Sequence, residues 1–192
     1  MYFQPSYLPA KIIKALRYFY QAYSTSELKW DEDPLKTTVI IDEIDNFTQK
    51  TIQALPRILV SRGQYNINPT GISDNMSESR STAVNKGNIN QKRFLTIEGV
   101  SQVLIEATNK GTVEKLVDMS THFLSWASPI IANSEGFKRF GLPMAVSPCT
   151  PAKEDTEMFQ CTLNLPWSRE ESFVYSEVGK GLSGFNINTL LS

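Results

Sequence analysis

Apolar residues near the start of the chain recur at the spacing of an α-helix. Between Leu8 and about Tyr23 they line one side, and three basic residues occupy the other side. Pro9 suits the first turn of a helix, where its missing N–H costs nothing. We therefore predict a helix over this range, packed by its apolar side on the core of its own domain.

A second helical pattern follows residue 111. Its apolar positions share one helical face: Val113, Leu116, Val117, Phe123, Leu124 and Ala127. Thr112 is a reasonable N-cap, because its hydroxyl can accept a hydrogen bond from the first turn. Pro129 is expected to end or kink the helix near Ser128, because proline lacks the N–H that a helix interior needs.

Other segments have the patterns of strands. Two short β-rich runs cover residues 37–41 and 58–60, and longer strands are predicted from Phe94 to Thr108 and from Glu157 to Trp167. Gly99 is a candidate bulge in the first long strand. In the second, apolar and polar residues alternate, which indicates a sheet with one buried face. Residues 145–147 and 173–175 are shorter strand candidates. We predict one α+β domain over residues 1–192, with a mixed or antiparallel sheet and helices packed on one face.

Residues 66–91 differ from their surroundings, because Ser, Thr, Asn and Gly dominate and apolar residues are sparse. A segment this polar contributes little to a core, so we predict a long polar loop or an extended hairpin. It is the first place to expect contacts with another molecule. Residues 168–192 are interpreted as a C-terminal extension, with a glycine-rich end that shows no clear element.

Composition narrows the classes of function. The chain of 192 residues has 19 Lys and Arg against 20 Asp and Glu, which argues against strong binding of nucleic acid by the isolated subunit, although a locally basic face stays open. No segment approaches the roughly 18 apolar residues needed to span a bilayer, and no basic leader precedes an apolar run. We expect a cytosolic protein or a part of a particle, with Cys149 and Cys161 as ordinary reduced thiols.

Residues for catalysis are scarce. His122 is the only histidine and falls within the second predicted helix, so a nucleophilic triad is not indicated. The glycine-rich motifs that hold nucleotides are absent, and the ligands for a usual metal site are not grouped. Acidic residues lie in polar, turn-like sequence: Asp31, Glu32, Asp33, Asp42, Glu43 and Asp45. We expect no enzyme and no cofactor, and a carboxylate-based hydrolase is the least favoured hypothesis.

The order of these elements resembles a known family. The features that carry the resemblance are the first helix, a proline-opened strand (LPRILVSRGQY, Leu55 to Tyr65), a polar loop, a strand-to-helix unit (VSQVLIEATNKGTVEKLVDMSTHFL), a turn (GLPMAVSP, Gly141 to Pro148) and a strand (CTLNLPW). From about Leu8 to Trp167 this order is similar to the tail-terminator, or tail-completion, proteins of tailed bacteriophages. The resemblance implies helices covering a mixed or antiparallel sheet, and assembly as a six-fold ring.

Such a ring caps the tail tube and joins it to the neck or head-completion proteins. The resemblance thus implies a place in the virion, assembly in the host cytoplasm, no membrane, and DNA that at most passes through without specific binding. Candidates for contacts between subunits are Phe94, Ile97, Val103 and Ile105. Candidates for contacts with a partner or with the lumen are Ser79, Arg80, Lys86 and Asn88. The alternative is a head-completion or connector protein of the neck.

Overall fold

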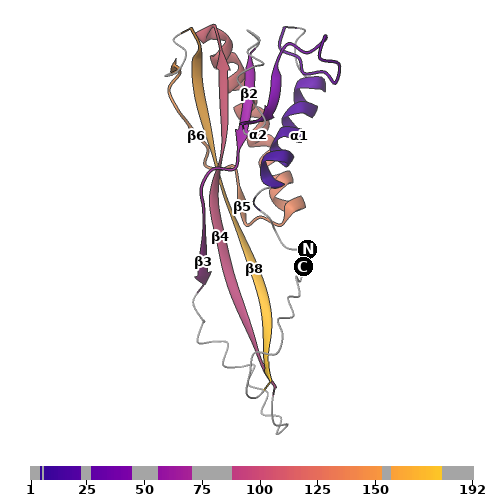
Figure 1. The fold of residues 1–192 in the computed structure, drawn as a ribbon, viewed down its shortest axis with the longest axis vertical. Helices are drawn as coiled ribbons and strands as arrows, with labels where there is room; N and C mark the ends of the chain where they lie inside the picture. Colours follow the sequence, from indigo (N-terminus) through magenta and orange to yellow (C-terminus); the bar gives the residue numbers. More distant parts are fainter. Residues whose placement is uncertain are drawn as a thin grey trace.

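The computed structural model describes residue 5 and residues 7–22, 27–44, 56–70, 88–152 and 157–178. Within them, two helices accompany an eight-stranded mixed sheet in one compact domain, which confirms the predicted α+β class (Figure 1). The elements in chain order are α1 (Tyr7–Ala22), β1 (Ile40–Glu43), β2 (Arg57–Ser61), β3 (Tyr65–Thr70), β4 (Asn88–Ala107), α2 (Lys110–Glu135), β5 (Arg139–Phe140), β6 (Ala145–Val146), β7 (Thr150–Pro151) and β8 (Phe159–Val178).

Two long antiparallel strands, β4 and β8, form the centre of the sheet. The strand order is β1-β2-β4-β8-β5, with β3 also pairing with β4, and β6 and β7 also pairing with β8. Of the strand pairs in the described residues, only β1 and β2 run parallel, and the register of β4 with β8 continues without a break from Ala107↔Phe159 to Asn88↔Val178. At about 3.3 Å per residue, each of these strands is roughly 65 Å long.

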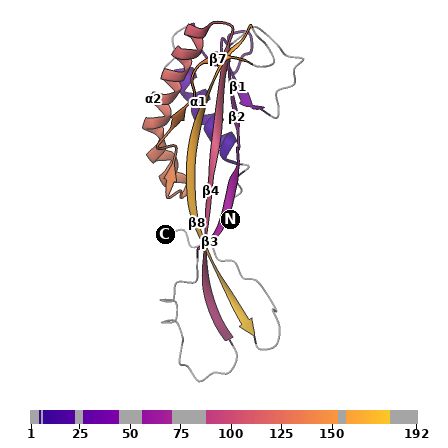
Figure 2. The same cartoon turned by 90° about the vertical axis from the view of Figure 1, so that its left-hand side faces the viewer.

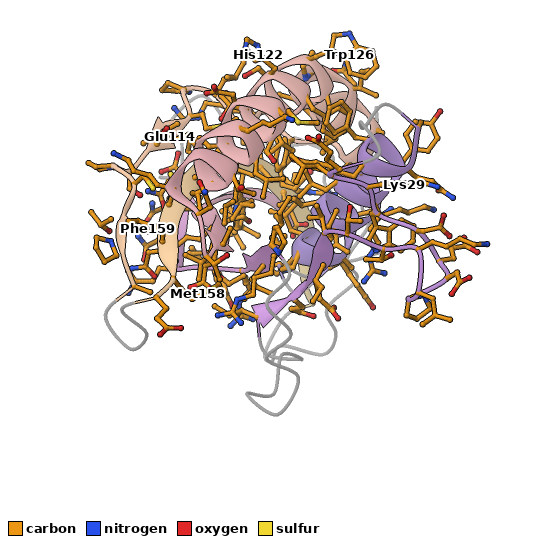
Figure 3. The ribbon with its side chains drawn as sticks, turned by 90° about the horizontal axis from the view of Figure 1, so that it is seen from above. Lys29, Glu114, His122, Trp126, Met158 and Phe159 are labelled. Carbon is orange, nitrogen blue, oxygen red and sulfur yellow. The ribbon has the colours of Figure 1, made fainter. Side chains whose placement is uncertain are left out.

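Both helices cover the same face of the sheet (Figures 1 and 3). Alternate residues of β4 and β8 point to that face, and Val103, Ile105, Leu163 and Leu165 are fully buried there. The helices contribute the apolar faces that the sequence predicts, among them Leu16 and the α2 set from Val113 to Ala127. One hydrophobic core therefore lies between a sheet and a pair of helices.

Helix α2 is longer than its sequence suggests. Asn109, and not Thr112, is the N-cap, and its side chain accepts a hydrogen bond from the N–H of Gly111. Of the two effects expected of Pro129, an end or a kink, the end near Ser128 does not occur, because the helix runs through Pro129 to Glu135. It ends where Gly136 takes a left-handed conformation (φ 69°) and the N–H of Phe137 returns to the carbonyl of Ala132.

The two polar segments both contribute strands to the sheet. Residues 65–70 form β3, which pairs with residues 94–99 of β4, so the ends of the 66–91 segment belong to an extended hairpin. Residues 168–178 are no separate extension, because β8 continues through them. A strand candidate at 173–175 is part of the same strand. The connection 71–87 and residues 179–192 lie outside the described residues.

A joint in the sheet lies where β2 passes into β3. The pairing changes from Ser61↔Gln102 to Tyr65↔Gly99, so residues 62–64 insert one residue more than β4 has opposite them. Gly63 takes φ +67°, and a Cβ there would lie 2.0 Å from the carbonyl oxygen of Val100. The irregularity predicted at Gly99 is thus at Gly63. Gly99 keeps register, and its missing side chain leaves room for the Trp167 ring.

Candidate functional site

The lower half of the sheet forms an arm that leaves the two-layer body. Figures 1 and 2 show β3 and the ends of β4 and β8 extending past the helices. We define the arm as residues 65–70, 88–99 and 167–178, which pair as β3-β4-β8 and, beyond the end of β3, as β4-β8 alone. Its root is Trp167, which is fully buried and contacts the rings of Tyr65 and Phe137.

The two faces of the arm near its root differ in polarity. Tyr65 lies opposite Gly99, and Ile67 lies opposite Ile97, so these residues share the face on which the helices pack. Tyr65 is 37% exposed and Ile67 is 55% exposed. The other face carries polar pairs, such as Asn66 opposite Glu98. The helix-side face is only partly apolar here, because Arg169, the β8 partner of Ile97, also lies on it and forms an ion pair with Glu171 at 3.5 Å.

The outer edge of β8 is covered in the body and open in the arm. The carbonyls of Met158, Thr162, Pro166 and Ser168 accept hydrogen bonds from the irregular edge segment that contains β5, β6 and β7. All four residues have even numbers, and alternate residues of a regular strand point their N–H and C=O groups the same way. From Glu170 to Val178 the even-numbered residues therefore point outward, and no described strand pairs with them.

The edges of the body, by contrast, are protected against further pairing. The N–H of Ile40 donates to the carbonyl of Pro56, the residue before β2, so the carbonyl of the next residue, Ile41, faces away from β2. Arg17 of α1 donates to that carbonyl through Nε at 3.0 Å and Nη2 at 2.7 Å. At the opposite edge, the segment 139–151 is broken into three two-residue strands. The hydrogen bonds from Arg17 and the short strands of the 139–151 segment are both ways of preventing edge-to-edge association.

A groove of about 1090 Å³ separates the outer surfaces of α1 and α2. Phe19 and Phe123 stack at its base with ring centroids 4.5 Å apart. Its rims include Tyr18, Trp126 and Ile130, which are 64%, 68% and 53% exposed. Figure 3 shows Trp126 and His122 projecting from α2 away from the sheet. Exposed apolar groups gathered in this way are typical of a surface that another molecule covers.

The residues expected to form subunit contacts do not form one surface. Val103 and Ile105 are 0% exposed and Ile97 is 6% exposed, so all three belong to the core of their own chain. Their side chains are therefore not available for the contacts between subunits that were expected of them. Phe94 lies in β4 opposite Ser172, within the arm. Of the partner and lumen candidates, Asn88 is the first residue of β4, opposite Val178. Ser79, Arg80 and Lys86 lie outside the described residues.

Sequence reasoning missed the groove and the open edge of β8. The groove has a signal in the sequence, because Tyr18, Trp126 and Ile130 are apolar positions outside the stripes that pack on the sheet, and two of them are four residues apart on one helix. The open edge has no such signal. Edge exposure depends on which strands are neighbours, and the sequence of one strand does not contain that information.

Groups that could carry out chemistry are held in structural roles in the described part of the chain. Burial raises the pKa of the Cys161 thiol and of Cys149, which lowers their nucleophilicity at neutral pH. The hydrogen bond from Lys29 holds the pKa of Asp31 below its usual range, the opposite of what a general acid needs. Buried Glu106 forms an ion pair with Arg57. The part of the chain that the structure describes contains no cluster of three or more potential metal ligands.

Comparison with known proteins adds no family to these observations. No protein-family model matches the chain, and no curated protein matches its sequence significantly. Neither described helix has the length and apolar character required to cross a membrane. Any assignment of function therefore rests on the geometry of the arm and the groove.

Proposed function

We propose that the chain is a subunit of a ring that caps the tail tube of a tailed bacteriophage and joins the tube to the neck or head-completion proteins. The observation that carries the proposal is the arm. A two-stranded ribbon is marginally stable by itself in water, and an uncovered sheet edge tends to pair with another chain. A structure that projects such a ribbon beyond its own core is suited to an assembly that surrounds the ribbon.

The groove supports the same proposal. Trp126 lies on the side of α2 that faces away from the sheet (Figure 3), and folding of the single chain leaves both Trp126 and Tyr18 of α1 more than half exposed. Aromatic side chains are enriched at the centres of protein interfaces. A ring subunit has two different surfaces that meet those of its neighbours, because head-to-tail contacts close a ring. The arm and the groove provide two such surfaces at different places on the molecule.

The distribution of charge is also compatible with a passage for DNA. The net charge of the chain is −1. Near its root, the arm's polar face carries Asn66, Glu98 and Glu170, and the last of these is paired with Lys138 at 2.7 Å. A surface of this kind offers no excess of cations for tight binding of phosphates. DNA would pass such a surface without being held.

The test is the native mass of the purified protein by light scattering, followed by negative-stain imaging with and without phage tail tubes. We expect rings, or monomers that form rings at tube ends when tubes are added. A monomer that ignores tubes and binds a portal or connector ring would replace this proposal with the neck-protein alternative. A protein that is indifferent to both would overturn the assignment to a phage tail or neck.

A further inference from the structure

Within the described residues, the arm has a second edge without a pairing strand, on the side opposite to that of β8. The N–H of Val100 donates to the carbonyl of Gln64, so the even-numbered residues of β4 point toward β3. Strand β3 ends at Thr70, opposite Phe94. From Lys92 to Asn88, therefore, the even-numbered residues of β4 point to a side where no described strand lies.

The two open edges lie at the same level of the arm. Val178 is the partner of Asn88, and Val174 is the partner of Lys92, so the open part of β8 lies directly across the ribbon from the open part of β4. The β8 edge and the β4 edge lie on opposite sides of the ribbon and face in opposite directions. A copy placed beside the first in the same orientation would bring its β4 edge to the first copy's β8 edge.

We propose that the β8 edge from Glu170 to Val178 pairs with the β4 edge from Asn88 to Lys92 of a second copy of this chain. Main-chain hydrogen bonds join the two arms, and strands in equally oriented copies run antiparallel, as β4 and β8 do within one arm. The contact is head-to-tail, so repetition gives a closed ring when the rotation between neighbouring copies divides a full turn. This inference rests on the proposed function insofar as it takes the chain to assemble with itself, and it identifies the part that joins the copies.

The occupant is a second copy because each arm carries both halves of the contact. An extended segment of an unrelated protein could use the β8 edge by strand addition, but it would leave the β4 edge open. The contrast with the body supports an assembly role for the arm, because Arg17 and the broken 139–151 segment protect the body's edges while the regular β8 edge beyond Ser168 has no such device. Its sequence up to Val178 also contains no proline after Pro166.

Residue-resolved amide hydrogen exchange tests the pairing. In the monomer, the N–H groups of Glu171, Phe173 and Tyr175 point to β4 and should already be protected. The N–H groups of Ser172, Val174 and Ser176 point outward and should exchange rapidly. On assembly we expect these three to slow by about tenfold or more, since exchange then requires opening of the new ladder. A change confined to even-numbered residues cannot arise from general stiffening of the arm.

Proline variants provide a matched pair for the same test. The double variant Ser172→Pro with Ser176→Pro removes two outward N–H groups and no bond to β4, so the concentration needed for assembly should rise at least about tenfold. Ser172→Ala with Ser176→Ala keeps both N–H groups and should assemble as the parent does. Urea unfolding midpoints of all three proteins establish that the fold is retained before assembly is compared.

Three outcomes would overturn the inference. Rings in which Ser172, Val174 and Ser176 still exchange as rapidly as in the monomer would exclude the edge pairing and leave the proposed ring function intact. Protection that appears only on a foreign tail tube would show that the occupant of the edge is another protein. A chain that stays monomeric alone and with tubes would overturn the inference and the ring function together.

Discussion

The body and the arm of this protein are built from the same two strands but are stabilised differently. In the body, β4 and β8 have helices on one face and protected edges on both sides of the sheet. In the arm, the same strands continue with edges that no described strand pairs, and the described helices do not extend along them. Folding of one chain gives the body the packing and edge contacts that stabilise a sheet. The described part of the arm does not have these contacts. The comparison suggests that the body supplies stability and the arm supplies contacts.

Trp167→Ala should have the largest effect on this division, because it removes the side chain at the root of the arm. Its side chain is 0% exposed and packs on Phe137 and over Gly99. Truncation of a buried tryptophan costs about 3–5 kcal/mol. The expected result is a matching loss in the free energy of unfolding, measured by urea titration. A loss below about 1 kcal/mol would show that the root of the arm is not stabilised by packing of Trp167 on the core of the body.

Gly63→Ala should have an intermediate effect and act on the connection between β2 and β3. The added Cβ would lie 2.0 Å from the carbonyl oxygen of Val100, and the backbone conformation with φ +67° disfavours any side chain. We expect a loss of about 2 kcal/mol in the free energy of unfolding. Amide exchange should increase more in β3 than in α2. Equal loosening of both would contradict a body and an arm that are separately stabilised.

Much of the body could be predicted from the sequence because its elements are amphipathic. The helical spacing of Leu16 with its neighbours and the alternation from Phe159 to Trp167 each reflect one buried and one exposed side. The end of α2 was missed because Pro129 was weighted above Gly136, a residue type typical of helix ends, and the helix continues through the proline to that glycine. The length of β8 was missed because the alternation of apolar and polar residues stops after Trp167, so the sequence has no period-two signal beyond that residue.

Candidate contact residues were less predictable than the fold. Apolar residues such as Val103 and Ile105 could lie in a core or in an interface, and their sequence pattern is the same in either case. The structure places them in the core. The open edge of β8 consists of main-chain groups, which every residue type other than proline supplies equally. Its position is determined by strand order and register, and neither property can be inferred from the sequence of β8 alone.

Tyr20→Phe should have a smaller effect, limited to the body. The hydroxyl of Tyr20 lies 3.0 Å from that of Ser120 and donates to the carbonyl of Leu116 at 3.3 Å, linking α1 to α2. Loss of these bonds should lower the free energy of unfolding by about 1 kcal/mol at neutral pH. The rates of amide exchange in the arm should stay unchanged.

The same substitution has a characteristic pH dependence. Burial raises the pKa of Tyr20 from 10.0 to about 12. Because the pKa is higher in the folded state, the contribution of the neutral phenol is fully present below pH 10 and is lost as the pH rises from about 10 to about 12. The parent should therefore lose more stability over this interval than Tyr20→Phe does. Parallel unfolding curves for the two proteins between about pH 9 and about pH 12 would contradict the buried position of the hydroxyl.

Trp126→Ser should have the smallest effect on stability. It tests whether contacts between copies are confined to the arm. The side chain is 68% exposed, so the free energy of unfolding should change by no more than about 0.5 kcal/mol. If the groove receives a neighbouring subunit, assembly should weaken by about 2 kcal/mol, since tryptophans at interface centres often contribute that much. Ser125→Ala, one residue away, serves as the control. Light scattering that shows equal assembly of both variants would assign the contacts between copies to the arm alone, whereas weaker assembly of Trp126→Ser would show that the body contributes a contact surface as well.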